Sequence, residues 1–203
     1  SVLKRRNVDG VIVFGFSNFD LTQLEQWQNR AVVIAMDTQQ VSSINYDNHG
    51  VITQALEYLS QQSVDNIAYI GVNASDRTTG KLRLDSYLEW CQTHQLVANY
   101  QTGDLHHESA YQLVDKVLNN QTQAIVCASD TLALGVIKRL QELNREDVIV
   151  TGVGGNELLS FLFPNVFSID PGYAQAGIKA AKLLISHIDG EGSLTHLTQK
   201  PVY

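Results

Sequence analysis

Polar, small and aromatic residues follow most of the buried strands that the sequence predicts. The segments with this composition are Phe16-Ser17-Asn18, Asp37-Thr38, Asn73–Thr79, Ser129-Asp130-Thr131, Gly154-Gly155-Asn156 and Asp170–Tyr173. In an open α/β sheet, ligands bind beyond the carboxyl ends of the strands, so these segments are the first places to look for a site. They hold no acid–base pair beside an obvious nucleophile. The pattern therefore favours a site that binds hydroxyl groups and predicts no catalytic residues.

Arg83 is the strongest single candidate for a ligand contact. It lies in the first turns of a predicted helix, between Leu82 and Leu84, where its guanidinium group can point into a binding site. The fixed fork of donors on an arginine suits vicinal hydroxyls or a phosphate. The alternative is a surface arginine that pairs with Asp76 or Glu89.

The loop before this helix can either cap the helix or bind a ligand. Asp76, Thr78 or Thr79 can accept hydrogen bonds from the first free amides of the helix. The same amides, at the positive end of the helix dipole, can receive a hydroxyl or an anion. Capping alone explains Asp76, whereas the threonines and Lys81 favour binding, and Arg77 belongs to the same candidate set.

The segment after a later buried strand divides between the same two roles. Asp130 stands where a new helix begins, so we expect it to be mainly structural. Ser129 and Thr131 beside it are the better candidates for contacts to a sugar. Asn156 follows the next predicted strand and joins the candidate set.

Tyr173 follows the turn-forming pair Pro171-Gly172. A tyrosine ring there can stack on a pyranose face while its hydroxyl hydrogen-bonds. The alternative is a tyrosine that only packs.

Three more candidates come from the first part of the chain. Gly15 and Phe16 end the first predicted strand; a glycine there allows the backbone to approach a ligand closely, or only permits a tight turn. Asp37, after the second strand, is placed to hydrogen-bond sugar hydroxyls.

Several motifs that suggest other chemistry do not hold up. His106-His107 with Glu108 lacks the helical spacing of a zinc hydrolase, so a solvated loop is the better interpretation. The run Gly152–Gly155 has no third glycine that opens a helix, which argues against a dinucleotide site. The sequence contains no P-loop and no G-x-S-x-G motif. It therefore predicts no metal and no cofactor.

Composition and charge limit the classes of partner. The 203 residues carry a formal net charge of −7, which argues against nucleic-acid binding by this segment, because duplex binding draws on clustered Lys and Arg. The basic run Lys4-Arg5-Arg6 is too short for that role. No apolar run has the length of a membrane span and no signal-peptide pattern opens the chain. Cys91 and Cys127 fall in predicted core segments, so reduced thiols in a cytoplasmic protein are expected, with a disulfide as the less favoured alternative.

Short apolar runs alternate with segments of helical period along the chain, which predicts parallel sheets with crossover helices. The predicted strands are Gly10–Gly15, Ala31–Met36, Ser42–Tyr46, Asn66–Val72, Ala124–Ala128, Val148–Val153 and Val166–Asp170. The predicted helices are Leu21–Asn29, Asn48–Gln61, Thr78–Gln95, Glu108–Asn119, Thr131–Leu143 and Tyr173–Asp189. The strand–helix pattern occurs twice, which favours two lobes over one sheet.

Five segments carry motifs that occur together, and in this order, in one family. They are Leu3–Ile12, Asn45–Gly50, Thr79–Tyr87, Cys127–Gly135 and Val153–Asn156. Each resembles the corresponding stretch of the lactose-repressor family of transcription regulators. Each match alone is weak, but five in order over the whole chain make the resemblance specific.

The resemblance implies a two-lobed α/β fold of the periplasmic-binding-protein type (type I), with parallel sheets flanked by helices. It assigns 1–61 and 173–190 to an N-terminal lobe that is incomplete here. It assigns 62–172 and 191–203, with a final strand near Thr195–Val202, to the other lobe. It also implies a homodimer that reads operator DNA through a helix-turn-helix absent from this sequence, and no association with a membrane.

Three segments resemble the regulators of trehalose use within that family: Ser75–Lys81, Cys127–Gly135 and Asp170–Gly177. The resemblance implies a repressor whose effector is trehalose 6-phosphate, trehalose or a related disaccharide, and which releases DNA when the effector binds. Met36 departs from the pattern, because a trehalose-responsive regulator has an arginine there and a thioether cannot replace its donors. The alternatives are a periplasmic sugar-binding receptor for transport and an enzyme that acts on sugar phosphates.

Overall fold

The computed structural model describes residues 7–15, 20, 22–25, 27, 29–36 and 38–202. The chain divides into two compact units. Unit 1 comprises Ser1–Asp47 and Gly172–Lys200, and unit 2 comprises Asn48–Pro171 and Pro201–Tyr203. The chain therefore passes from one unit to the other three times, after Asp47, Pro171 and Lys200.

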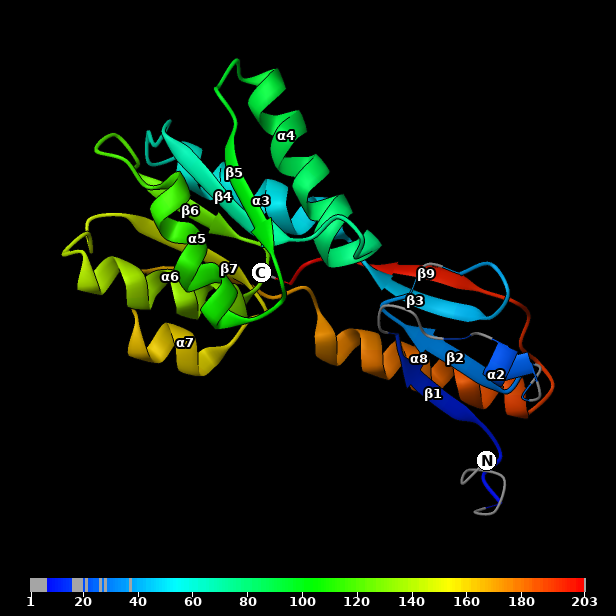
Figure 1. Cartoon of the computed structure of the whole chain (residues 1–203). Coiled ribbons are helices and arrows are strands. Elements are labelled where there is room, and N and C mark those ends of the chain that lie inside the picture. The colour runs from blue at the N-terminus through cyan, green and yellow to red at the C-terminus, as the bar shows by residue number, and fades with distance from the viewer. Residues whose placement is uncertain are drawn as a thin grey trace. The chain divides into compact units, whose positions relative to one another are not determined.

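Unit 2 is built on a parallel sheet of five strands in the order β5-β4-β6-β7-β8 (Figure 1). The strands are β4 (Ile67–Val72), β5 (Asn99–Gly103), β6 (Ala124–Cys127), β7 (Ile149–Val153) and β8 (Val166–Ile169). Four of the five were predicted, because β4, β6, β7 and β8 are apolar runs. β5 was not predicted, because its residues Asn-Tyr-Gln-Thr-Gly lack an apolar run. Among the described strands it is an edge strand that pairs with β4 alone.

Helices cover both faces of this sheet. They are α3 (Asn48–Ser60), a π-helical segment (Arg77–Leu82) continued by α4 (Arg83–Thr93), α5 (His107–Val117), α6 (Asp130–Glu142) and α7 (Glu157–Leu162). Side chains alternate between the faces of a strand, so the contacts assign each helix to a face. Tyr69 of β4 stacks on Tyr87 of α4, whereas a side chain at Gly152 of β7 would meet Ala133 of α6.

Unit 1 has a parallel sheet of four strands in the order β1-β2-β3-β9. They are β1 (Val11–Phe14), β2 (Ala31–Ile34), β3 (Ser42–Tyr46) and β9 (His196–Gln199), with the helices α2 (Thr22–Glu25) and α8 (Tyr173–Ile188). On one face, Ala176 and Ala180 of α8 pack on Ile34 and Ile44. The small side chains of the helix let it approach the β-branched strands closely.

The boundaries of the two units differ from the predicted lobes. Residues 48–60 were assigned to the first lobe, yet α3 packs against unit 2, where Tyr58 stacks on Phe167 at 4.0 Å between ring centroids. The final strand was assigned to the second lobe, yet β9 pairs with β3 in unit 1. An apolar helix face or a short strand fits either sheet, and the sequence does not say which sheet it completes.

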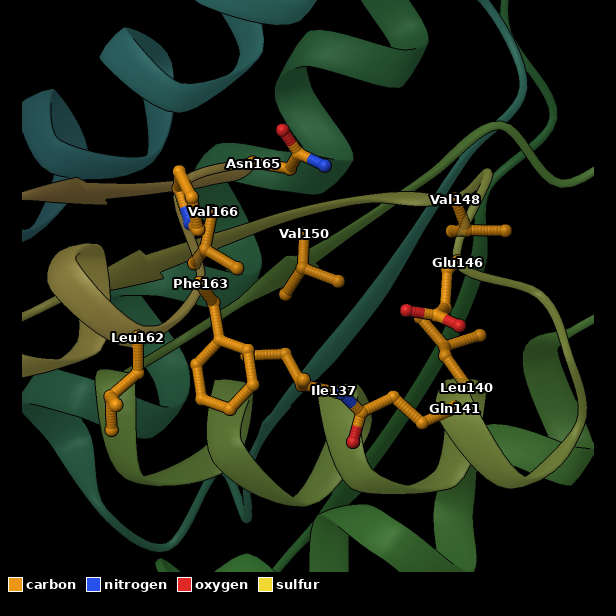
Figure 2. Close-up of a pocket in the computed structure, with 11 residues that line it drawn as sticks. Ile137, Leu140, Gln141, Glu146, Val148, Val150, Leu162, Phe163, Asn165 and Val166 are labelled. Atoms are coloured by element: carbon orange, nitrogen blue, oxygen red, sulfur yellow. The ribbon is translucent and has the colours of Figure 1, made fainter.

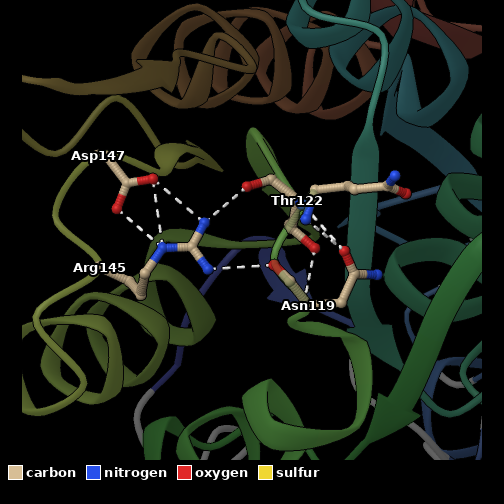
Figure 3. Close-up of polar contacts among 5 residues, drawn as sticks. Asn119, Thr122, Arg145 and Asp147 are labelled. Atoms are coloured by element: carbon tan, nitrogen blue, oxygen red, sulfur yellow. Dashed lines mark hydrogen bonds and ion pairs between the residues drawn. The ribbon is translucent and has the colours of Figure 1, made fainter.

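Arg145 joins two loops at the amino end of the unit 2 sheet (Figure 3). Arg145 donates through Nη1 to the carbonyl of Asn119 and through Nη2 to the carbonyl of Thr122, each at 3.0 Å. Its Nε donates to Asp147 at 2.9 Å. The loop before β7 is thereby joined to the loop before β6.

Within the described ranges, no helix has the length and apolar character needed to cross a bilayer. Cys91 and Cys127 are both free and buried. Burial raises the pKa of both thiols, which keeps them protonated and unreactive at neutral pH. The expectation of reduced core thiols is confirmed.

Candidate functional site

Arg83 is a buried side chain at the carboxyl end of the unit 2 sheet. Only 4% of the residue is exposed. Its Nε donates to Oδ1 of Asn48 at 2.8 Å, and its Nη1 donates to the carbonyl of Ala128. It therefore connects the first residues of α3 and α4 with the end of β6. The alternative of a surface arginine paired with Glu89 does not hold, because Glu89 contacts His49 and Arg83 lies inside.

The loop before α4 is closed by its own aspartate. Oδ1 of Asp76 accepts hydrogen bonds from the amides of Thr78, Thr79 and Gly80 at 3.0, 2.8 and 3.2 Å. Gly80 is required here, because a Cβ at this position would lie 2.2 Å from the carbonyl oxygen of Asn73. The amides that an anion would need are thus already paired, so a ligand could contact this loop only through side chains.

Asp130 is the centre of a second polar cluster at the same end of the sheet. Its carboxylate accepts from the hydroxyl of Ser168 at 2.7 Å and from the amide of Asn156 at 3.0 Å. A side chain on Gly152 or Gly154 would collide with the carboxylate oxygens. Burial raises the pKa of Asp130, while its hydrogen bonds and the charge of Arg83 act in the opposite direction.

The neighbours of Asp130 mostly serve as helix caps. The Ser129 hydroxyl accepts from the amide of Leu132 at the start of α6. The Asn156 side chain accepts from the amides of Leu158 and Leu159 at the start of α7. Thr131, in the first turn of α6, is exposed. Of these predicted contacts, Thr131 and Asn156 are exposed and Ser129 is half-buried.

In unit 1, Tyr173 begins α8 and is 47% exposed. Its ring meets Tyr46 edge-on, with 5.1 Å between centroids. Gly172 before it has φ of +86° and lies against the side chain of Gln199, so a Cβ there would be both strained and obstructed. The turn thus sets the position of the tyrosine ring.

Of the remaining predicted residues, Gly15 directly follows β1 and Met36 lies shortly after β2. Gly15 packs against Met36, whose Cβ would be 2.6 Å from a Cβ at Gly15. Met36 packs on the apolar cluster that contains Val11 and Trp27. The tight packing explains the glycine without a ligand. Phe16 and Asp37 lie outside the described residues.

The structure thus brings Arg83, Ser129, Asp130 and Asn156 together at one end of the unit 2 sheet. Two residues at this place were not among the predicted site residues. Asn48 was recognised only as part of a motif, although it begins a helix at a point where the chain changes units. Tyr69 was assigned to a buried strand, where a tyrosine carries no local signal of a role in a site.

The hollow in unit 2 shown in Figure 2 lies elsewhere. Its volume is about 240 Å³, and Ile137, Val150 and Phe163 line it together with residues of the loops around them. It is at the amino ends of β7 and β8, and none of the predicted site residues lines it. The predicted hydroxyl-binding residues and this apolar hollow are therefore separate features.

The two histidines whose spacing argued against a zinc site form a pair on the surface. His106 and His107 stack on each other at 4.3 Å, and the His106 side chain is 56% exposed. Over the part of the chain that the structure describes, no group of three or more His, Cys, Asp or Glu side chains is placed to hold a metal ion.

Comparisons with known proteins match this architecture. A family model described as a periplasmic binding protein-like domain matches residues 56–202. The HTH-type transcriptional regulator TreR of Escherichia coli K12 is 42% identical over 189 residues, which are 93% of this chain and 60% of that protein. The TreR of Salmonella typhimurium LT2 is 41% identical with the same coverage. The chain thus spans about 60% of the length of these curated relatives.

Solved structures of other proteins have the same fold. The trehalose repressor from Escherichia coli superposes with a TM-score of 0.94 at 39% identity, covering 99% of this chain and 79% of that one. A complex of the regulator CelR with cellobiose superposes at 0.82 and 24% identity, covering 99% of this chain and 66% of that one, which bears on the fold alone. The predicted α/β fold and the motif resemblance are both confirmed. The chain belongs to the periplasmic binding protein-like domain family, within the lactose-repressor family of transcription regulators.

Proposed function

We propose that this chain is the effector-sensing part of a transcriptional repressor and binds trehalose 6-phosphate or a related disaccharide. The observation that carries the proposal is the buried guanidinium of Arg83 at the carboxyl end of the unit 2 sheet. A fixed fork of donors at that place suits the hydroxyls of a sugar or a phosphate. The similarity to TreR of Escherichia coli supports trehalose as the sugar.

In this proposal the two units are the two lobes of the sensor, and the ligand binds to residues at the carboxyl end of the unit 2 sheet. The sugar must bind one arrangement of the lobes more tightly than the other, since otherwise it shifts no equilibrium. Arg83 holds Asn48, the first residue of unit 2 after the chain leaves unit 1 at Asp47. A sugar that contacts Arg83 would therefore act close to a point where the lobes are joined.

The identity of the effector depends on how a phosphate would be held. Met36 has no hydrogen-bond donor and packs among apolar side chains. Recognition of a phosphate would fall to other cations, of which Arg77 lies in the predicted site. Trehalose itself remains the alternative ligand.

The partners follow from the same proposal. Operator DNA would be bound by a helix-turn-helix outside this chain, in the cytoplasm, and the effector would release it. A homodimer is supported by apolar side chains on α7 that face solvent: Leu158, Phe161 and Leu162 are 64%, 82% and 56% exposed. Side chains of this size and exposure, adjacent on one short helix, favour a protein partner. The proposed role is binding and not catalysis.

Isothermal titration of the intact protein with trehalose 6-phosphate and with trehalose tests the proposal. We expect binding of the phosphorylated sugar, and release of operator DNA when it is added. Absence of binding by both sugars would overturn the proposal. Binding without any effect on DNA would favour the transport receptor, and appearance of a hydrolysed product would favour the enzyme.

A further inference from the structure

Tyr69 carries a buried hydroxyl that the packing of unit 2 leaves without a hydrogen-bond partner. The residue is 0% exposed and lies in the middle of β4. Its hydroxyl oxygen has no partner among the protein groups that the structure describes. A buried hydroxyl without a partner destabilises a fold, and phenylalanine would fill the same space without that penalty. The hydroxyl therefore calls for an explanation other than packing.

Gly71 directs this hydroxyl toward the carboxyl end of the sheet. Residues 69 and 71 lie on the same face of β4 because side chains alternate along a strand. A Cβ at Gly71 would lie 2.4 Å from Cε1 and 2.9 Å from the hydroxyl oxygen of Tyr69. The ring therefore occupies the space above the glycine and points along the strand, in the direction of the last residues of β4.

That end of the strand is where Arg83 lies. Ile70 of β4 is bonded through its carbonyl to the amide of Ala128, and the carbonyl of Ala128 accepts from Arg83. Burial raises the pKa of the Tyr69 hydroxyl, and the positive charge of Arg83 acts in the opposite direction. Tyr69 thus adds a buried donor at the same end of the sheet as the guanidinium.

A neighbouring tyrosine shows that the packing of this region can satisfy a hydroxyl. Tyr87 stacks on Tyr69 with 5.1 Å between ring centroids. Its hydroxyl donates to the carbonyl of Ile67 at 2.9 Å and accepts from the amide of Asn99 at 3.0 Å. Two stacked, buried tyrosines therefore differ in one respect, which is whether the hydroxyl is paired.

We propose that Tyr69 is a specificity-determining residue of the sugar site: its hydroxyl and the Arg83 guanidinium donate to one shared oxygen when the ligand binds. This oxygen belongs to a hydroxyl or phosphoryl group of the ligand, or to one enclosed water that the ligand holds in place. The inference rests on the proposed function, because it assigns the missing partner of Tyr69 to the bound sugar.

The substitutions Tyr69→Phe and Tyr87→Phe test it as a matched pair. Each removes one oxygen from the same stack of rings. For Tyr69→Phe we expect a higher denaturant midpoint in the absence of sugar, and affinity for trehalose 6-phosphate that is roughly 3- to 10-fold weaker. For Tyr87→Phe we expect a lower midpoint and unchanged affinity, because its hydroxyl already has protein partners. Urea unfolding and isothermal titration of the intact protein measure the two quantities.

Opposite signs for stability and affinity distinguish a ligand-binding hydroxyl from a structural one. A lower midpoint for Tyr69→Phe would show that the hydroxyl is already paired, and would overturn the inference whatever the ligand. Unchanged affinity in Tyr69→Phe, with wild-type binding intact, would overturn this inference alone. If the wild-type protein binds neither trehalose 6-phosphate nor trehalose, the proposed function fails and this inference fails with it.

Discussion

Two arginines at opposite ends of the unit 2 sheet both donate hydrogen bonds to backbone carbonyl groups and to a side chain, but they differ in how deeply they are buried. Arg83, at the carboxyl end, donates to the carbonyl of Ala128 and to the side chain of Asn48. Arg145, at the amino end, donates to two carbonyls and to the side chain of Asp147. Arg83 is 4% exposed, whereas Arg145 is nearer the surface and forms a salt bridge with Asp147.

The difference indicates which end of the sheet is available for function. A buried cation has a large desolvation cost, which binding of an anion or a set of hydroxyls can offset. A cation that forms a salt bridge near the surface has its charge balanced already and mainly holds two loops together. We therefore expect a ligand to bind at the carboxyl end, and the contacts at the amino end to serve stability.

Removing each arginine tests this comparison with the largest expected effects. We expect Arg83→Ala to weaken binding of trehalose 6-phosphate by about 100-fold or more, because several charge-assisted bonds are lost. It should also reduce the free energy of unfolding by about 2–4 kcal/mol, since buried acceptors lose their donor. Titration calorimetry and urea unfolding of the intact protein measure the two effects.

Arg145→Ala is the matched control. We expect unchanged sugar affinity and a loss of about 1 kcal/mol in the free energy of unfolding, because the freed carbonyls are close enough to the surface to bond water. Equal affinity losses for both variants would contradict the distinction between the two ends.

The two arginines also show how much the sequence could predict. Arg83 was identified as a site residue because it follows a capping loop between two leucines. Its actual partners, Asn48 and Ala128, are 35 and 45 residues away along the chain, and no local pattern gives such pairings. Arg145 was not singled out at all, since its role depends on carbonyls of a loop that comes close only in the folded sheet.

Asp130 at the carboxyl end and Asp147 at the amino end should make the free energy of unfolding depend on pH in opposite directions. Burial raises the pKa of Asp130 above its ordinary 3.8. At pH values between 3.8 and the raised native pKa, Asp130 keeps its proton in the native protein and has lost it in the unfolded chain. The free energy of unfolding therefore falls as the pH rises through this window. Arg145 lowers the pKa of Asp147 below 3.8, so the stability from this pair is present above 3.8 and is lost as pH falls through the lowered pKa.

The substitutions Asp130→Asn and Asp147→Asn isolate these contributions. On acidification from about pH 7 to pH 3, the wild-type protein should gain free energy of unfolding relative to Asp130→Asn. Over the acidic part of the same range it should lose free energy relative to Asp147→Asn. Unfolding curves recorded across the range measure both differences. The same sign for both would show that the two ends are not electrostatically distinct.

The fold was more predictable than the site for a physical reason. Strands such as Ala124–Cys127 are continuous apolar runs because helices cover both faces, and composition alone reveals them. The amides of Thr78 and Thr79 pair with Asp76, so both residues belong to the cap, and their side chains stay predicted ligand contacts. Capping and ligand binding use the same residue types at the same place, so only the coordinates separate the two. Tyr69 was missed because a buried hydroxyl looks like any other strand tyrosine until its partners are counted.

The smallest effect concerns the apolar hollow at the amino end, which Val150 lines (Figure 2). Val150→Ile adds one methylene group beside Ile137 and Leu140, where there is space for it. We expect a gain of up to about 0.8 kcal/mol in the free energy of unfolding, the value of one buried methylene group, and unchanged affinity for sugar.

Val126→Ile provides the control, because Val126 is 0% exposed on the other face of the sheet and does not line the hollow. The same added methylene group should there destabilise the protein by about 1–3 kcal/mol through overpacking. Urea unfolding measures both variants. If Val150→Ile weakened sugar binding, the amino end would communicate with the site at the carboxyl end, and the division between a structural end and a ligand-binding end would have to be abandoned.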